Sequence, residues 1–252
     1  METIDLESIS INGLSELVRK RELSPVEIIK ATLQRIERYD GELKAFITVL
    51  SEEALDCAKK AEASIVRGDY TGPLHGIPIG LKDIIFTKGI RTTCGSKILA
   101  DFIPREDATV VNRLKKAGAI IIGKLNCHEF AYGATSINPH YGTPKNPWNG
   151  RCIPGGSSGG SAVAVGSSLC LGALGTDTAG SVRIPSALCG IVGLKPTYGR
   201  VSSYGVYPLS WSQDHVGPMT KTVKDAAILL GSIAGHDPRD HTSSSVPVPD
   251  YL

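Results

Sequence analysis

Residues 154–168, PGGSSGGSAVAVGSS, combine a turn dense in glycine and serine with an apolar run that resembles a buried helix. Each glycine in a regular element costs about 0.5–1 kcal/mol of backbone entropy relative to alanine. A chain that holds such a turn directly against a buried segment needs a backbone path that other residues cannot follow. The block therefore predicts a tight loop packed on the core, and its serines are candidate functional groups.

The rest of the chain alternates between strand-like and helix-like patterns. Short apolar runs typical of strands lie at 45–50, 77–85, 119–123, 169–177 and 190–196. Helical patterns lie near 24–36 and at 52–67, 107–116 and 222–234. Strands that alternate with helices predict an α/β fold whose sheet is covered by helices on both faces.

Local signals indicate where several helices begin and end. Ser24-Pro25-Val26-Glu27 is a capping box with proline at the first helical position. Gly68 and Gly235 are expected to end helices, and Asp107 is expected to cap one.

The bulk properties indicate a single domain. With 252 residues, 41% hydrophobic and 21% charged, the chain can bury a sizeable core. The net charge of +2 points to neither direct nucleic-acid binding nor an anionic membrane. We expect a helical segment at 1–70, a catalytic core at 71–240 and a linker-like tail at 241–252.

Targeting, membrane and metal-binding patterns are not visible. Residues 1–15 lack a basic segment, and the apolar run at 161–174 is too short and too polar to span a membrane. The six cysteines are scattered without a CxxC pair, which argues against a zinc site and a disulfide framework. We therefore expect a cytoplasmic protein with no metal and no other cofactor.

One near match to a phosphate-binding loop is GAIIIGKL at 118–125. It departs from GxxxxGK[ST] because Leu125 stands where a hydroxyl would hold magnesium. Residues 119–122 also have a strand pattern rather than that of a loop with exposed amides. A core strand is the interpretation that we prefer.

Residues 155–159 match G-x-S-x-G, the nucleophile elbow of α/β-hydrolases. That motif follows a strand, whereas KNPWNGRCIP precedes it here and contains two prolines. The histidine most suited to such a triad is His215, beside Asp214. Because adjacent residues point in different directions, we do not expect them to form the pair.

A third pattern joins two glycine-rich turns and a lysine. GTDTAGSVRIPSA at 175–187 carries Ser181, and Lys82 lies in the apolar stretch GIPIGLKDI. The simplest interpretation is that Lys82 extends its amine to solvent and that the loops are turns. Two serines and a neutral lysine can, however, perform acyl transfer. Half neutrality at pH 7 requires the lysine pKa to fall by about three units, roughly 4 kcal/mol, which full burial can supply.

These stretches resemble the amidase signature family of Ser-cisSer-Lys amidohydrolases. The resemblance rests on GPLHGIPIGLKDI, GGSSGGSAVAV, GTDTAGSVRIPSALCGIVGLKPTYGRVS and DHVGPMTKTVKDAA, and it extends over residues 11 to about 240. It implies a mixed β-sheet core covered by helices on both faces. Family chains are nearly twice as long, so we expect a chain truncated at its C-terminus, without the half that completes the sheet and much of the substrate pocket.

The resemblance implies roles for three residues. Ser181 is the expected nucleophile, and Ser157 is the bridging serine, preceded by a cis peptide bond from Gly156. Lys82 takes a proton from Ser157, which relays it from Ser181. Backbone N–H groups from Thr178 through Ala179 and Gly180 to Ser181 are expected to form the oxyanion hole.

Other residues are expected to support this site. Asp177 and Arg183 flank the nucleophile loop as a pair that maintains its shape, and Ser158 lies beside the bridging serine. Ala131, in the segment NCHEFAYG, is an expected substrate contact. Ala179 stands where the family usually has glycine, which is tolerated if that position does not need a positive φ.

The family contains two enzyme classes that both fit. GHDPRDHTS and KPTYGRVSSYGV resemble the A subunit of the aspartyl/glutamyl-tRNA amidotransferase, which uses glutamine and works with the B and C subunits. His215 stands where that A subunit more often has glutamine, which favours a stand-alone amidase for small aliphatic or aromatic amides. A third alternative is an inactive chain that acts as an interaction module.

Overall fold

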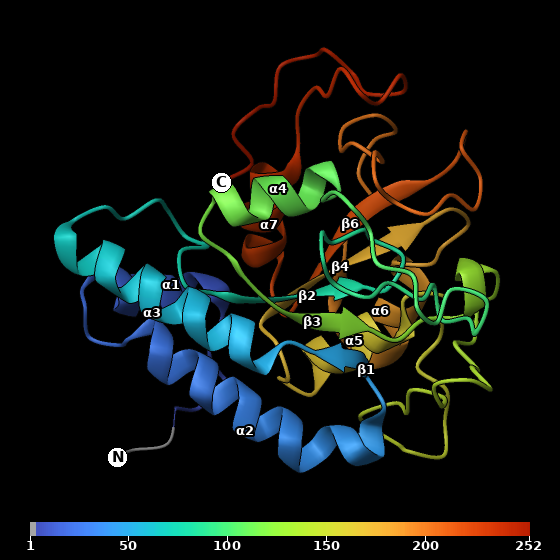
Figure 1. The fold of residues 1–252 in the computed structure, drawn as a ribbon, viewed down its shortest axis with the longest axis horizontal. Helices are drawn as coiled ribbons and strands as arrows, with labels where there is room; N and C mark the ends of the chain where they lie inside the picture. Colours follow the sequence, from blue (N-terminus) through green and yellow to red (C-terminus); the bar gives the residue numbers. More distant parts are fainter. Residues whose placement is uncertain (1–3) are drawn as a thin grey trace.

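The computed structural model describes residues 4–252, in which helices surround a central sheet (Figure 1). The α-helices are α1 (Ile11–Arg19), α2 (Pro25–Leu43), α3 (Ser51–Arg67), α4 (Thr109–Lys116), α5 (Gly159–Gly166), α6 (Arg183–Cys189) and α7 (Val223–Ile233). The strands are β1 (Phe46–Val49), β2 (Pro78–Lys82), β3 (Ile120–Leu125), β4 (Gly172–Asp177), β5 (Val192–Gly193) and β6 (His215–Thr220). A 3-10 turn, η1, spans Glu129–Ala131.

The sheet is mixed, as the family resemblance implies. Its strand order is β1-β3-β2-β4-β6-β5. Strand β2 is parallel to both β3 and β4, whereas β1, β6 and β5 pair with their neighbours in antiparallel fashion. The predicted fold class, an α/β fold with a mixed sheet and flanking helices, is confirmed.

Buried apolar side chains form two clusters, one on each face of the sheet. Neighbouring strand residues alternate between them: Ile121 belongs to one cluster, and Ile120 and Ile122 belong to the other. Helices α1, α4 and α7 contribute to the first cluster, and α5 and most of α2 contribute to the second. No helix within residues 4–252 is long and apolar enough to cross a membrane.

Several helix ends lie where the local signals predict them. The capping box at Ser24 and Glu27 is formed, and Gly68 ends α3 with a φ of 97°. Helices α2 and α3 pack side by side beside β1 (Figure 1). The prediction for Asp107 was wrong, because Ala108 is the N-cap of α4 and makes no side-chain cap. Asp107 instead accepts hydrogen bonds from Lys88 N and Lys115 Nζ, both at 2.7 Å.

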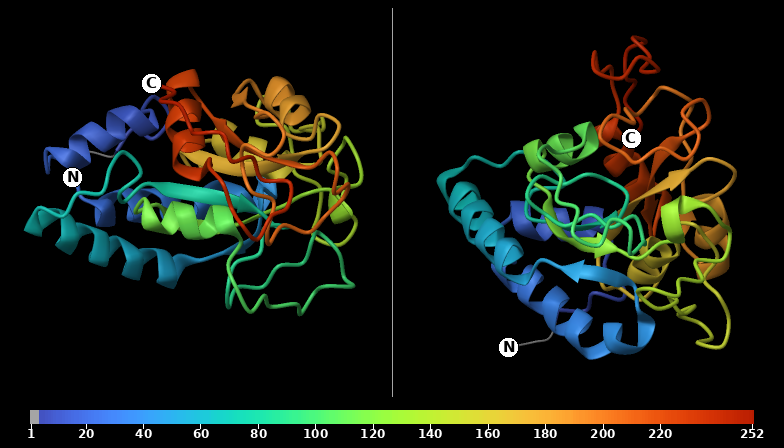
Figure 2. Two further views of the ribbon diagram at one scale, coloured as in Figure 1. Left: turned by 90° about the horizontal axis from the view of Figure 1, so that it is seen from above. Right: turned by 45° about the vertical axis from the view of Figure 1, so that its right-hand side comes forward.

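The strands deliver candidate residues to one end of the sheet. Lys82 is the last residue of β2 and Asp177 is the last residue of β4. Because β2 and β4 are parallel, both residues lie at the same end of the sheet. Long connecting segments gather at this end of the molecule (Figures 1 and 2).

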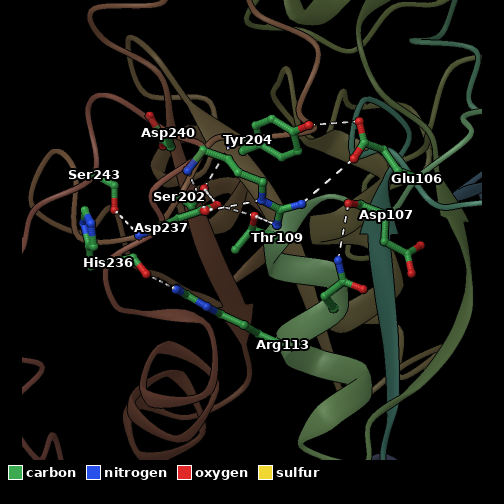
Figure 3. A network of polar contacts seen from close by, with 12 residues as sticks. Glu106, Asp107, Thr109, Arg113, Ser202, Tyr204, His236, Asp237, Asp240 and Ser243 are labelled. Carbon is green, nitrogen blue, oxygen red and sulfur yellow. Dashed lines mark hydrogen bonds and ion pairs between the residues drawn. The ribbon is translucent and has the colours of Figure 1, made fainter.

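The tail after α7 has no helix or strand from 236 onward, yet it is tied to the core (Figure 3). Asp237 accepts hydrogen bonds from Thr109 Oγ1 at the start of α4 and from Ser202 Oγ. Arg113 of α4 donates to the carbonyl oxygens of residues 233, 235 and 236. The segment at 241–252, expected to resemble a linker, is also held, because Arg200 Nη1 donates to the carbonyl oxygens of residues 246 and 247.

Asp237 is the buried centre of this network. Burial raises the pKa of its carboxyl, but hydrogen bonds from Thr109, Ser202 and the backbone of Arg239 outweigh that effect, and its pKa lies at about 2. The folded-state pKa is below the value of 3.8 expected in the unfolded chain. Asp237 therefore stabilises the fold above pH 4, and this contribution is lost as the pH falls towards 2.

We expect the wild-type chain to lose, through Asp237, about 1 kcal/mol of unfolding free energy by pH 3 and about 2 kcal/mol by pH 2. Urea denaturation followed by circular dichroism from pH 5 downward measures this loss. Asp237→Asn should be less stable at pH 5 and should lack this part of the acid dependence. The exposed Asp101 offers a matched control, since Asp101→Asn should keep the wild-type dependence. Equal acid dependence in wild type and Asp237→Asn would contradict the account.

Candidate active site

Lys82 is fully buried at the end of β2. Its Nζ donates hydrogen bonds to Ser157 Oγ at 2.7 Å and to Thr176 Oγ1 at 2.8 Å. The alternative in which the amine reaches solvent is therefore excluded. Thr176 is a partner that the sequence did not suggest, because a threonine inside a buried strand has no pattern that distinguishes it.

The environment of Lys82 raises the share of its neutral form. Burial lowers the pKa of the Lys82 ammonium to about 8, although several negatively charged or ionisable groups, including Asp214 and Asp177, act in the opposite direction. At pH 7 about one molecule in ten would hold this amine in its neutral form. The shift has the direction that a proton-accepting lysine needs.

Ser157 lies in the glycine-serine block and is held in place through hydrogen bonds to its backbone carbonyl oxygen. The peptide bond between Gly156 and Ser157 is cis, as the resemblance implies. The Ser157 carbonyl oxygen accepts hydrogen bonds from His128 N at 3.1 Å and from Ser136 Oγ at 3.3 Å. These contacts leave the Ser157 side chain beside Lys82.

Two features dock the start of α5 on the sheet. Ser158 Oγ donates to the carbonyl oxygen of Thr176 and accepts from its N–H, both at 3.2 Å. Gly160 packs so closely that an added Cβ would collide with the carbonyl oxygens of Ala45 and Asn126. The dense glycines thus permit close packing of the helix and the serine turn against β1, β3 and β4.

Ser181 lies in the loop between β4 and α6. Its carbonyl oxygen accepts a hydrogen bond from Ser158 N at 3.2 Å, which joins this loop to the serine block. The side chain is half-buried, and within residues 4–252 the Ser181 hydroxyl has no protein hydrogen-bond partner. Gly180, with a φ of 124°, provides a left-handed turn immediately before it.

Asp177 and Arg183 form a bidentate ion pair across this loop. Arg183 Nε and Nη2 each donate to the buried carboxylate at 2.9 Å. The backbone N–H groups of Gly180 and Val182 donate to the same carboxylate at 2.8 and 3.2 Å. Burial raises the pKa of Asp177, but these hydrogen bonds outweigh it and keep the pKa below its usual value.

The backbone donors of the loop differ in their availability. The Gly180 N–H is engaged by Asp177, so it differs from the free donor that the sequence led us to expect. In the described part of the chain, the N–H groups of Thr178, Ala179 and Ser181 have no acceptor. Ala179 is absent from the residues with positive φ, so its methyl group is accommodated without strain.

Ala131 lies in η1, the turn that a hydrogen bond from His128 N joins to the serine block. It is buried and has a φ of 59°, and Phe130 before it has a φ of 49°. Consecutive non-glycine residues in the left-handed region are uncommon. His128, at the N-cap of η1, donates its N–H to Ser157, and this places the turn next to the serine block.

The alternative motifs do not assemble sites of their own. Asp214 accepts a hydrogen bond from Thr178 Oγ1, whereas His215 Nδ1 bonds to the Asp177 carbonyl oxygen, so the two do not form a triad with Ser157. The near phosphate-binding motif is strand β3. Its Lys124 is buried and donates to the Ile85 carbonyl oxygen and to Thr92 Oγ1.

A cavity of about 400 Å³ adjoins the site at Thr176. Its walls combine Asp214 and His215 with aromatic and aliphatic side chains, including Tyr204, Tyr207, Leu209 and Trp211. Cavities of this size accommodate small organic ligands. Among the residues that the structure describes, no group of three or more histidine, cysteine or acidic side chains is placed to hold a metal ion.

Comparison with known sequences identifies close relatives. A family model described as Amidase matches residues 27–252. The A subunit of the Geobacter sulfurreducens glutamyl-tRNA(Gln) amidotransferase is 53% identical over 248 residues, which cover 98% of this chain and 51% of the relative. The corresponding subunit of Carboxydothermus hydrogenoformans is 49% identical over 249 residues, which cover 99% of this chain and 51% of that relative. The chain thus spans about half the length of the curated relatives that it matches.

Solved structures also match. The peptide amidase of Stenotrophomonas maltophilia has a TM-score of 0.94 and 39% identity, covering 98% of this chain and 52% of that one. The A subunit of the Thermotoga maritima glutamyl-tRNA(Gln) amidotransferase has a TM-score of 0.83 and 41% identity. This match covers 97% of this chain and 51% of that one.

Proposed function

This chain belongs to the amidase family, and from that premise we propose that it cleaves carboxamide C–N bonds through an acyl-enzyme on Ser181. The observation that carries the proposal is the buried hydrogen bond of 2.7 Å between Lys82 Nζ and Ser157 Oγ. It joins a lysine whose pKa is lowered by burial to a serine whose neighbour, Ser158, donates its N–H to the Ser181 carbonyl oxygen.

In the proposed reaction, neutral Lys82 accepts a proton from Ser157, and Ser157 accepts the proton of Ser181 as Ser181 Oγ attacks the amide carbon. The free N–H groups of Thr178, Ala179 and Ser181 are candidate donors to the oxyanion that forms. The C–N bond then breaks as the leaving nitrogen takes the proton back along the same chain. Water attacks the resulting ester, releases the carboxylic acid and restores the Ser181 hydroxyl.

Glutamine is the amide that we propose as substrate, with the B and C subunits of an amidotransferase as partners. Support comes from relatives named as the A subunit of such an enzyme, which are 48–53% identical over nearly the whole chain. The ammonia released from glutamine would pass to a partner subunit. A stand-alone amidase is the second candidate, since the similar solved structures include a peptide amidase.

Ammonia release distinguishes the two candidates. The 252-residue chain, alone and with the B and C subunits, is given glutamine, propionamide or benzamide at equal concentrations. We expect glutamine to be the preferred amide and the added subunits to increase its turnover. Faster turnover of benzamide without partners would favour the stand-alone amidase. No release from any amide, with no covalent labelling of Ser181, would indicate the interaction module.

The pH dependence of acylation tests the role of Lys82. If Lys82 must be neutral, the rate at which a fluorophosphonate probe labels Ser181 should rise with pH through the lysine pKa of about 8. The neutral fraction increases about tenfold between pH 7 and pH 9, and the rate should follow it. Rates are corrected for probe decay without protein. A rate that is flat or falls over this range would contradict the role.

A further inference from the structure

Asp214, just before β6, and His215, its first residue, contact the last residue of β4, Asp177, and the residue after it, Thr178. Asp214 Oδ1 accepts a hydrogen bond from Thr178 Oγ1. His215 Nδ1 lies 3.0 Å from the carbonyl oxygen of Asp177. We propose that Asp214 and His215 are positioning residues that hold the first part of the Ser181 loop from β6, an inference that rests on the proposed function.

The contacts of His215 fit one tautomer of its ring. The Asp177 carbonyl oxygen can only accept, so Nδ1 carries the proton and donates. Nε2 lies 3.2 Å from Lys195 Nζ, and an ammonium group can only donate, so Nε2 accepts. The tautomer with its proton on Nδ1 satisfies both partners.

Other contacts fix the orientation of the His215 ring. His215 is paired with Asp177 in the antiparallel register of β4 and β6, which places its side chain close to the end of β4. The ring packs edge-on against Tyr198, with 5.5 Å between centroids and 74° between planes. Tyr198 is itself anchored, since its hydroxyl donates to the Trp211 carbonyl oxygen at 2.9 Å.

Asp214 is equally well anchored. Its second carboxylate oxygen accepts hydrogen bonds from Leu209 N at 2.8 Å and Ser210 N at 3.0 Å. The carboxylate thereby joins the 209–210 turn to the Thr178 hydroxyl. Asp214, just before β6, and His215, its first residue, thus hold Thr178 and Asp177 through different groups.

The whole loop is consequently held at both ends. The Asp177 carboxylate holds its later residues, Gly180 and Val182, while His215 and Asp214 hold the Asp177 carbonyl and the Thr178 hydroxyl. Ser181 and the free N–H groups lie between these contacts. Without the β6 contacts, the loop would keep its ion pair but lose the restraint on its first two residues.

The test compares His215→Phe, which keeps a planar ring without a donor, with His215→Asn, whose amide nitrogen can occupy the place of Nδ1. Two quantities are measured in the full chain: the rate of fluorophosphonate labelling at Ser181 and the hydrogen exchange of the Gly180 amide, which donates to the Asp177 carboxylate. His215→Phe should label about fivefold more slowly, as expected for one lost hydrogen bond, and exchange faster. His215→Asn should recover most of both. His236→Phe, at an exposed histidine, should leave both unchanged.

Two outcomes separate this inference from the proposed function. If wild type is labelled at Ser181 and His215→Phe matches it in both rate and exchange, the positioning role is wrong and the proposed function stands. If wild type is not labelled, the proposed function fails, and hydrogen exchange alone decides the positioning role. Faster exchange in His215→Phe, reversed in His215→Asn, would then uphold it, and unchanged exchange would overturn it.

Discussion

Lys82→Met is expected to reduce acylation of Ser181 by at least about 10²-fold while the chain stays folded. Methionine fills a similar volume among the buried side chains, but it cannot accept a proton from Ser157. Lys82→Arg should be equally damaging, because a guanidinium keeps its proton across the working pH range. Labelling rates, compared with circular dichroism and thermal unfolding of the same samples, measure both effects.

The control for these variants is Lys30→Met, at an exposed lysine of α2, which should label at the wild-type rate. Substantial labelling of Lys82→Arg would show that the buried amine has a structural role only. If Lys82→Arg loses both its labelling and its circular dichroism signal, the variant has unfolded. The role of Lys82 is then decided by Lys82→Met, because its neutral side chain introduces no buried charge.

Ser181→Ala is expected to reduce amide turnover to background, by at least about 10³-fold, with almost no change in stability. The reason is geometric: within residues 4–252 the Ser181 hydroxyl has no protein partner, so its removal breaks no hydrogen bond. Ser157→Ala should also reduce turnover but should destabilise the fold by about 1 kcal/mol, since it removes an acceptor of the buried Lys82 amine. Ammonia release and chemical denaturation of the three proteins measure these differences.

The pair of serine variants also tests the alternative assignment. If Ser157 were the nucleophile, Ser181→Ala would retain turnover and Ser157→Ala alone would abolish it. If both variants kept turnover, the serine–lysine cluster would be unrelated to catalysis.

Local sequence signals predicted those elements whose ends depend on neighbouring residues. The capping box at Ser24, the glycine stop at Gly68 and the buried strand β3 all follow from short-range chemistry. Strand β6 was not predicted, because HVGPMT contains glycine and proline, which are poor strand formers. Its structure depends on pairing with β4, a contact between distant parts of the chain.

The candidate site residues divide in the same way, into those that local sequence reveals and those that depend on contacts between distant parts of the chain. The glycine-serine turns and the buried lysine have unusual composition, so Lys82, Ser157 and Ser181 could be singled out before the structure was known. The contacts of Thr176, Asp214 and His215 depend on the registers of β2, β4 and β6, which no local pattern encodes. The failed cap at Asp107 has the same origin, since its partner Lys88 lies in another part of the chain.

The identity of the acylated residue tests the central claim most directly. The wild-type chain is trapped with a fluorophosphonate probe, digested and analysed by tandem mass spectrometry, which locates the added mass on a single side chain. We predict the adduct on Ser181 and on no other serine. An adduct on Ser157 would contradict the assignment of the nucleophile, and a chain that remains unmodified under conditions where other serine hydrolases react would contradict the acyl-enzyme mechanism.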